Sequence, residues 1–162
     1  MPPGAEPQLK LQQPQSPEDW HQARGLVQEY AASLHMDLGF QNIAHELEHL
    51  STQYSAPTGA FLIAAEQGLA LGCAGVRRFA DCDGEIKRLY VVPAARGRGI
   101  GMQLARRIIE EGHRLGYARL LLDTLPAMPE AQALYAALGF RPTSAYRFNP
   151  VPGAAYFELS LR

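Results

Sequence analysis

The chain has 162 residues, of which 47% are hydrophobic and 19% charged, enough apolar material for one globular domain and too much for a disordered chain. Its net charge of −1 excludes an overall field that attracts nucleic acid or anionic membranes, so any anion site must be local. Two cysteines are too few for a disulfide framework, and no apolar stretch reaches the length of a membrane span. We therefore expect a cytoplasmic protein with a disordered tail at residues 1–7 and a single domain over residues 8–162.

The first part of the chain predicts a strand followed by two helices. Residues 8–13 alternate as a short strand does. Ser16 is typical of a helix start, because it can accept a hydrogen bond from a free backbone N–H and is followed by Pro17 and two acidic residues. Apolar residues at helical spacing carry this helix over residues 17–34 and predict a second over residues 40–50.

From residue 60 the hydrophobic pattern changes to that of strands. A hairpin with a Gln67-Gly68 turn and a second tight turn predict three consecutive antiparallel strands, and helices then alternate with strands. These strands are expected over residues 61–66, 70–79, 85–92, 119–124, 141–148 and 155–161, and the helices over 99–115 and 129–138. The strand–helix–strand crossover is parallel and right-handed if its strands are neighbours. The order predicts a mixed α/β (α+β) fold with about seven strands and four helices.

A basic, glycine-rich turn leads into the helix at residues 99–115. A helix N-terminus offers free N–H groups and a positive dipole end, and glycines let an anion approach closely. Met102 and Gln103 follow the last glycine where a nucleoside-triphosphate loop needs Lys and then Ser or Thr, and the dinucleotide pattern Gly-x-Gly-x-x-Gly is absent as well. The alternative is a flexible loop whose arginines are simply solvated. The basic and glycine residues of this turn are Arg96, Gly97, Arg98, Gly99 and Gly101.

Two motifs stand in this half of the chain, one behind the other. The first is Leu89-Tyr90-Val91-x-Pro93 with Arg96-x-x-Gly99-x-Gly101, and the second is Ala133-Leu134-Tyr135-x-x-Leu138-Gly139-Phe140. Together they resemble the GCN5-related N-acetyltransferases, the GNAT family, strongly over residues 85–140 and loosely elsewhere. The resemblance implies a sheet splayed open between the strands at 85–92 and 119–124, with acetyl-coenzyme A (acetyl-CoA) bound in the splay as cosubstrate.

The resemblance assigns the contacts to acetyl-CoA residue by residue. Backbone groups of the strand at 85–92 would pair with the pantetheine arm, and the pyrophosphate would lie on the amides that follow. The expected cofactor-binding residues are Leu89, Tyr90, Val91, Arg96, Gly97, Arg98, Gly99, Ile100, Gly101 and Met102. One position departs from the family, since many members have an asparagine where this chain has Met128, so that contact is absent or supplied by backbone.

The resemblance also implies the catalytic groups. Tyr135 matches the tyrosine that protonates the coenzyme A sulfur, with core packing as the alternative. The general base is expected from Asp123, which could instead cap the next turn, or from Glu85. Strand alternation places Glu85, Lys87 and Leu89 on one face, which also allows Glu85 to be a solvent-side partner of Lys87. A backbone N–H near Val91 would stabilise the oxyanion.

Two further segments are Asp123-Thr124-Leu125-Pro126-x-Met128 and Tyr146-x-x-Asn149-Pro150-x-Pro152-Gly153. Together they resemble a bacterial subgroup whose acceptors are mostly unassigned. Tyr146, Arg147 and Asn149 precede a proline-rich turn, which by resemblance borders the acceptor site. We predict Tyr146 and Asn149 as substrate-binding residues, with a plain surface turn as the alternative.

The sequence His45-Glu46-Leu47-Glu48-His49 matches the His-Glu-x-x-His pattern of zinc enzymes, but a chain of this length with the motifs above leaves little room for one, and we expect no metal. The predicted function is direct transfer of an acetyl group to a primary amine of a small molecule or amino acid, without a nucleic-acid or membrane partner. The alternatives are acetylation of a protein N-terminus or lysine, and a non-catalytic acyl-CoA-binding regulator. Family members often form homodimers, and nothing in the sequence fixes an interface.

Overall fold

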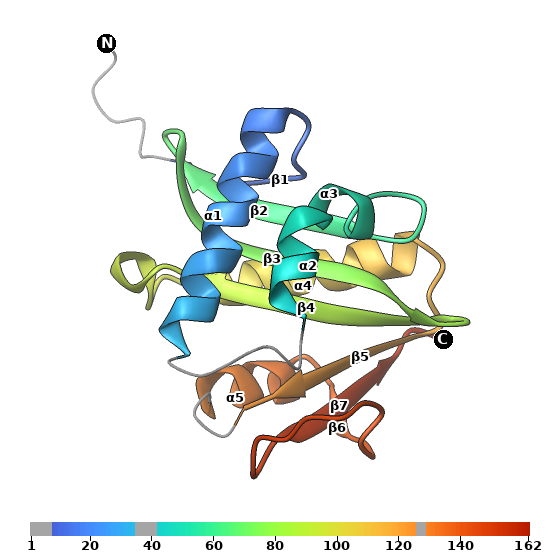
Figure 1. Ribbon diagram of the computed structural model, residues 1–162. Helices are drawn as coiled ribbons and strands as arrows, with labels where there is room; N and C mark the ends of the chain where they lie inside the picture. The colour runs from blue at the N-terminus through green and yellow to red at the C-terminus, as the bar shows by residue number, and fades with distance from the viewer. Residues whose placement is uncertain (1–7, 35–41, 126–128) are drawn as a thin grey trace.

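A seven-stranded mixed sheet in the order β1-β2-β3-β4-β5-β7-β6 forms the centre of the molecule (Figure 1). The computed structural model describes residues 8–34, 42–125 and 129–162, so the predicted tail and Met128 lie outside the described residues. Only β4 and β5 pair in parallel, as the crossover predicts. The strands are β1 (Lys10–Gln12), β2 (Ala60–Glu66), β3 (Leu69–Ala80), β4 (Asp83–Val91), β5 (Arg119–Thr124), β6 (Arg141–Pro142) and β7 (Ala155–Ser160). The predicted mixed sheet is confirmed.

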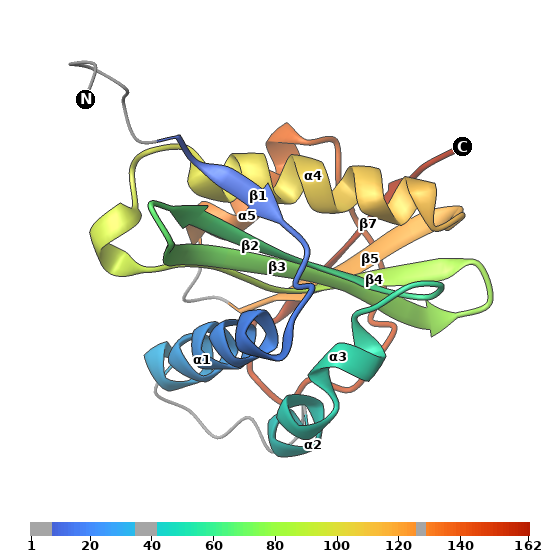
Figure 2. The same ribbon diagram turned by 90° about the horizontal axis from the view of Figure 1, so that it is seen from above.

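Helices cover both faces of the sheet. Within the described ranges they are α1 (Pro17–Ser33), α2 (Ile43–Glu48), α3 (Leu50–Gln53), the short 3₁₀ helix η2 (Pro93–Ala95), α4 (Ile100–Arg114) and α5 (Pro129–Ala137). Figure 2 shows α1, α2 and α3 on one face and α4 on the other. The helix predicted over residues 40–50 is divided in two, because His49 leaves the helical conformation with φ −117° and ψ 23°. None of the described helices combines the length and apolarity needed to cross a bilayer.

The start of α1 is fixed locally, as the sequence predicts. Ser16 Oγ accepts a hydrogen bond of 3.1 Å from Asp19 N, while Asp19 Oδ2 accepts one of 3.2 Å from Ser16 N. This reciprocal cap satisfies backbone groups that the first helical turn leaves free. The same backbone hydrogen bonds, from Gln15 and Ser16, lower the pKa of Asp19 below its ordinary value.

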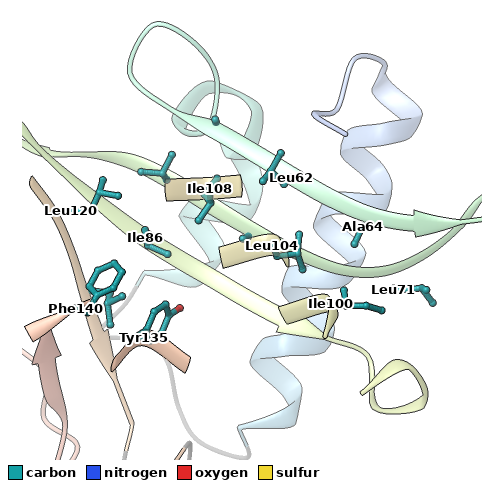
Figure 3. Packing of buried hydrophobic residues seen from close by; sticks show 14 of the residues in the cluster. Leu62, Ala64, Leu71, Ile86, Ile100, Leu104, Ile108, Leu120, Tyr135 and Phe140 are labelled. Atoms are coloured by element: carbon teal, nitrogen blue, oxygen red, sulfur yellow. The ribbon is translucent and has the colours of Figure 1, made fainter. Parts of the chain in front are cut away.

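Each face of the sheet carries its own core cluster. On the α4 face, Ile100, Leu104 and Ile108 repeat every four residues and pack on strand residues such as Leu62 (Figure 3). Leu104 and Ile108 are fully buried, which stabilises the fold by about 1.5–3 kcal/mol for each side chain. On the α1 face, a second cluster joins residues of α1, α3 and the central strands; its members include Ala23, Leu26, Val27, Leu50, Tyr54 and Phe61.

The sheet opens between β4 and β5. The two strands pair only where Asp83–Glu85 lies beside Arg119–Leu121, and beyond that point they diverge towards α5 in Figure 1. A β-bulge in β4, with Arg88 at φ 63°, shifts the register with β3. Leu89 therefore packs on the α4-face cluster, and the prediction that it shares a face with Glu85 is wrong.

The strand predicted over residues 141–148 is limited to Arg141 and Pro142, which pair with β7. Residues 143–154 instead form a loop between β6 and β7 whose polar side chains contact β4 and β5, as described below. The polar side chains of this loop are therefore held by contacts with distant strands, and the loop does not pair as a strand beyond Pro142.

Candidate active site

The turn from β4 into α4 leaves the first amides of α4 without a side-chain cap. The N-cap is Gly99, which has no side chain to accept their hydrogen bonds. Gly97 and Gly99 have φ of 82° and 77°, while a Cβ at either position would meet no atom of residues 8–34, 42–125 or 129–162 within 4 Å. Backbone conformation, and not lack of space, therefore requires glycine here. The uncapped amides and the helix dipole suit a diphosphate.

A groove of about 840 Å³ runs from this turn along β4 to α5 and α1. Arg96 lines it, and its Nε donates a hydrogen bond of 3.1 Å to the carbonyl oxygen of Val91. Arg98 does not line it, because its guanidinium donates to Glu66 Oε2 on β2 at 2.5 Å. The predicted cofactor-binding residues that line the groove are Leu89, Tyr90, Val91, Arg96, Gly97, Gly99, Ile100, Gly101 and Met102.

A small polar pocket adjoins this groove where β4 and β5 separate. The pocket and the groove share Tyr30, Leu89, Leu125 and Ala131 as lining residues. The pocket volume is about 40 Å³, which accommodates a few heavy atoms. Its polar lining residues are Tyr30, Lys87, Arg88, Asp123, Thr124, Tyr135 and Asn149.

Tyr135 projects from α5 into this pocket and is only 5% exposed. Its ring packs edge-on against Phe140 at 5.3 Å between centroids, and Figure 3 shows its hydroxyl directed away from Phe140. Burial raises the pKa of the Tyr135 phenol, so the hydroxyl stays protonated at neutral pH and can donate a proton. The ring of Tyr135 therefore packs in the core while its hydroxyl faces the pocket, so the two alternatives for this residue do not exclude each other.

Glu85 is fully buried on β4, and three side chains lie within 3.5 Å of its carboxylate oxygens. Tyr146 donates a hydrogen bond of 2.8 Å to Oε2, and Arg147 Nη2 donates one of 2.7 Å to Oε1. Arg77 Nη2 lies 3.5 Å from Oε1. Glu85 does not line the pocket, so its geometry suits positioning of the last loop better than proton transfer.

The alternative that made Glu85 a solvent-side partner of Lys87 is right about the partner, whose Nζ lies 3.9 Å from Glu85 Oε2, and wrong about the solvent side. Neither residue is exposed, because the loop of residues 143–154 contributes partners that cover this part of β4. Burial, with a further contribution from the Glu85 carboxylate, raises the pKa of Tyr146, so this phenol remains a hydrogen-bond donor.

Asp123 on β5 lines the pocket beside Asn149 of the last loop. Asn149 Nδ2 donates a hydrogen bond of 3.1 Å to Asp123 Oδ2, and Asn149 Oδ1 accepts one of 3.0 Å from Val151 N. Asn149 therefore shapes its own turn, as the surface-turn alternative requires, and also contacts the candidate base.

Among the polar pocket residues, Tyr30, Lys87, Arg88 and Thr124 were missed as site residues in the sequence. Lys87 and Thr124 are buried, and their Nζ and Oγ1 atoms have no hydrogen-bond partner within the described residues. Tyr30 of α1 lines both the pocket and the groove, although its spacing indicated only a core position. The available signal was the position of Lys87 in the strand that carries the first motif, since lysine is rarely buried unless it is paired.

A second buried ionic cluster fixes α2 to the sheet. Glu46 accepts hydrogen bonds from Arg88 Nε at 2.6 Å, Arg77 Nη1 at 2.9 Å and the Tyr54 hydroxyl at 3.1 Å. Burial alone would raise the pKa of Glu46, but hydrogen bonding and the charge of Arg88 lower it below its ordinary value. Glu46 thus links α2 to β3 and β4 and is not available as the base of a zinc site.

The two histidines of the His-Glu-x-x-His pattern lie on α2 and at its end. Their rings, His45 and His49, stack with centroids 4.3 Å apart, and His49 Nδ1 lies 3.0 Å from the His45 carbonyl oxygen. In the part of the chain that the structure describes, no three His, Cys, Asp or Glu side chains gather as metal ligands.

Comparison with known proteins agrees with this geometry. The model of the acetyltransferase (GNAT) family matches residues 17–140. A protein of Schizosaccharomyces pombe named as an uncharacterized N-acetyltransferase is 41% identical over 149 residues, 90% of each chain. The chain therefore belongs to the GNAT acetyltransferase family, and it is an N-acetyltransferase that uses acetyl-CoA as acetyl donor.

Two further proteins show how far the similarity extends. The N-acetylaspartate synthetase of Danio rerio is 32% identical over 110 residues, which cover 67% of this chain and 39% of that protein. A Salmonella typhimurium structure, described as an acetyltransferase with its cofactor acetyl-CoA, has a TM-score of 0.69 at 20% identity, over 95% of this chain and 94% of that one. The latter shows a common fold.

Proposed function

We propose that the protein transfers the acetyl group directly from acetyl-CoA to the primary amine of a small molecule. The observation that carries this proposal is the junction between the 840 Å³ groove and the 40 Å³ polar pocket at the opening of the sheet. The groove has the size and the uncapped helix end for a long phosphorylated donor. The pocket beyond it accommodates only the head of a small acceptor.

The residues around the junction supply the groups that acetyl transfer needs. The diphosphate would lie on the amides at the start of α4 near Arg96, which faces the groove. Arg98 is less suited to this contact because it is paired with Glu66. The edge of β4 beyond the bulge would guide the pantetheine arm towards the pocket.

In the proposed reaction the amine nitrogen attacks the thioester carbonyl carbon. The N–C bond forms, the C–S bond breaks, and its electron pair goes to sulfur, which takes the Tyr135 hydroxyl proton. The amine loses its surplus proton to Asp123, directly or through water, and that proton returns to Tyr135 by way of solvent. A carboxylate in the pocket and a neutral phenol support these two assignments.

One further point supports a small acceptor, and another supports a reducing compartment. The related synthetase from Danio rerio is named for N-acetylaspartate, an acetylated amino acid. Cys73 and Cys82 are both free thiols, which favours a cytoplasmic setting.

The test is a product assay. Wild-type protein is incubated with acetyl-CoA and a panel of amino acids, small amines and lysine-containing peptides, with release of the coenzyme A thiol and product mass as readouts. We expect acetylated small amines. Acetylation of peptides alone would favour a protein acetyltransferase, and binding of acetyl-CoA without turnover on any acceptor would favour a regulator; either result contradicts the proposal.

A further inference from the structure

A buried ammonium group in the acceptor pocket has no hydrogen bond to the described part of the chain. Lys87 is 6% exposed, and its Nζ has no hydrogen-bond partner among the residues that the structure describes. The nearest carboxylate oxygens, Glu85 Oε2 and Asp123 Oδ1, both lie 3.9 Å away, too far for a hydrogen bond. Burial of a cation without hydrogen bonds is unfavourable in free energy. The N–H donors of Lys87 would therefore be satisfied by an acceptor group of a ligand that enters the pocket.

The neighbouring carboxylates are turned towards other partners. Glu85 accepts from Tyr146 and Arg147, and Asp123 accepts from Asn149. Arg88, the other cation that lines the pocket, is bound by Glu46 through Nε and Nη2. Lys87 is therefore the pocket cation whose hydrogen-bonding capacity is unused within the described chain.

A second donor in the same pocket points to the same kind of ligand. Thr124 is 5% exposed, and its Oγ1 also has no hydrogen-bond partner in the described ranges. A carboxylate offers several acceptor sites on two oxygens and can accept from an ammonium and a hydroxyl together. A singly charged group also fits better than a phosphate dianion, because Asp123 lies close to Lys87.

We propose, on the basis of the acetyl transfer proposed above, that the acceptor carries a carboxylate next to its reactive amine and that Lys87 Nζ binds this carboxylate. The class of acceptor is then an α-amino acid. Its ammonium group faces Asp123, which takes one proton and releases it to solvent so that the neutral amine attacks, while its carboxylate faces Lys87. The 3.9 Å between these two side chains lets adjacent groups of one molecule reach both. Asp123 and Lys87 thereby select the two ends of a zwitterion.

The charge state of Lys87 is compatible with this assignment. Burial lowers the pKa of Lys87 to about 8, against the opposing effect of Glu85. The side chain is therefore still mostly protonated at neutral pH, and a bound carboxylate would favour its charged form further.

The experiment compares matched acceptors that differ only in the carboxylate. Acetylation rates are measured for several amino acids and for their carboxamides, with wild-type protein and with Lys87→Met. The amine of an amino-acid amide has the lower pKa and is more often neutral, so amine ionisation works against the proposal. We expect wild type to prefer the acid in kcat/KM by about tenfold to a hundredfold. Lys87→Met is expected to bring the ratio of kcat/KM for acid and amide, measured within the same variant, to about one.

Each other outcome has a defined meaning. Acetylation of amines without preference for the acid overturns the carboxylate proposal and leaves the proposed transferase function intact. A preference that survives in Lys87→Met overturns the assignment to Lys87. Failure of every small amine contradicts the proposed function itself. If Lys87→Met does not fold, as judged by circular dichroism, the wild-type comparison of acid and amide decides alone.

Discussion

The hydroxyl of Tyr146 donates a hydrogen bond of 2.8 Å to Oε2 of Glu85 across 61 positions of sequence. Together with the bond from Arg147 to Oε1, it ties the loop of residues 143–154 to the central strand β4. Asn149, on the same loop, reaches Asp123 in the pocket. The buried carboxylate of Glu85 therefore holds the loop that supplies Asn149 to the small pocket.

Replacement of Glu85 by Gln tests this positioning role. The variant keeps the shape but leaves the buried cations around it without their counter-charge, so we expect the free energy of unfolding to fall by about 3 kcal/mol in chemical denaturation. We also expect KM for the acceptor to rise about tenfold with an unchanged Kd for acetyl-CoA. The control is Glu158→Gln, which removes a half-exposed partner of Arg119 and costs about 1 kcal/mol or less. Equal stability of the two variants would contradict the role of Glu85.

Tyr135→Phe separates proton donation from binding. The buried phenol is neutral and faces the pocket, so removal of its hydroxyl is expected to lower kcat by about 10²-fold to 10⁴-fold. Because the ring still packs on Phe140, Kd for acetyl-CoA and the melting temperature stay close to wild type. Unchanged kcat in steady-state assays would assign Tyr135 to the core alone.

Two glycine variants are expected to change stability in opposite directions. Gly99→Ala places a side chain at φ 77°, which costs about 1–2 kcal/mol, and we expect weaker acetyl-CoA binding because the turn carries the uncapped amides. Gly101→Ala lies inside α4 at ordinary φ, with the new Cβ 3.6 Å from Leu134, so it gains up to about 1 kcal/mol. Chemical denaturation of both variants measures the difference. Equal destabilisation of the two variants would contradict the claim that the positive φ of Gly99 is what requires glycine there.

Acceptor binding should depend on pH through Lys87. Its pKa of about 8 means that the ammonium is present below pH 8 and lost above it, so KM for an amino acid is expected to rise about tenfold per pH unit above pH 8. The groups that set this pKa besides burial are Glu85, Asp123, Arg88 and Arg147. The carboxamide acceptor and Lys87→Arg, which stays charged, serve as controls without this rise. An equal pH dependence for acid and amide would contradict the prediction.

Much of the fold is determined by local features that a single sequence displays. Three such features act over a few residues each: the Ser16 cap, the four-residue spacing of Ile100, Leu104 and Ile108, and the turn glycines. The predicted elements around them are confirmed. The groove residues on β4, on the turn and at the start of α4 are also close together in the sequence, so a local pattern was enough to predict them.

The parts that sequence patterns missed depend on distant contacts. The bulge at Arg88 shifts the alternation of β4, so Leu89 turns to the other core. Glu85 is buried because partners come from a loop about 60 residues away, and those contacts also replace the strand expected beyond residue 142. Lys87 can be recognised as a site residue only from the folded chain, in which it lines one pocket with Asp123 and Thr124 of β5.

The most direct test of the account is calorimetric titration of acetyl-CoA into the folded protein. We predict one binding site per chain, about tenfold or more weaker binding by Arg96→Glu, and little change in Arg98→Ala, because Arg96 faces the groove whereas Arg98 is paired with Glu66. No detectable binding by wild type, or equal binding by Arg96→Glu, would contradict the placement of the donor at the start of α4.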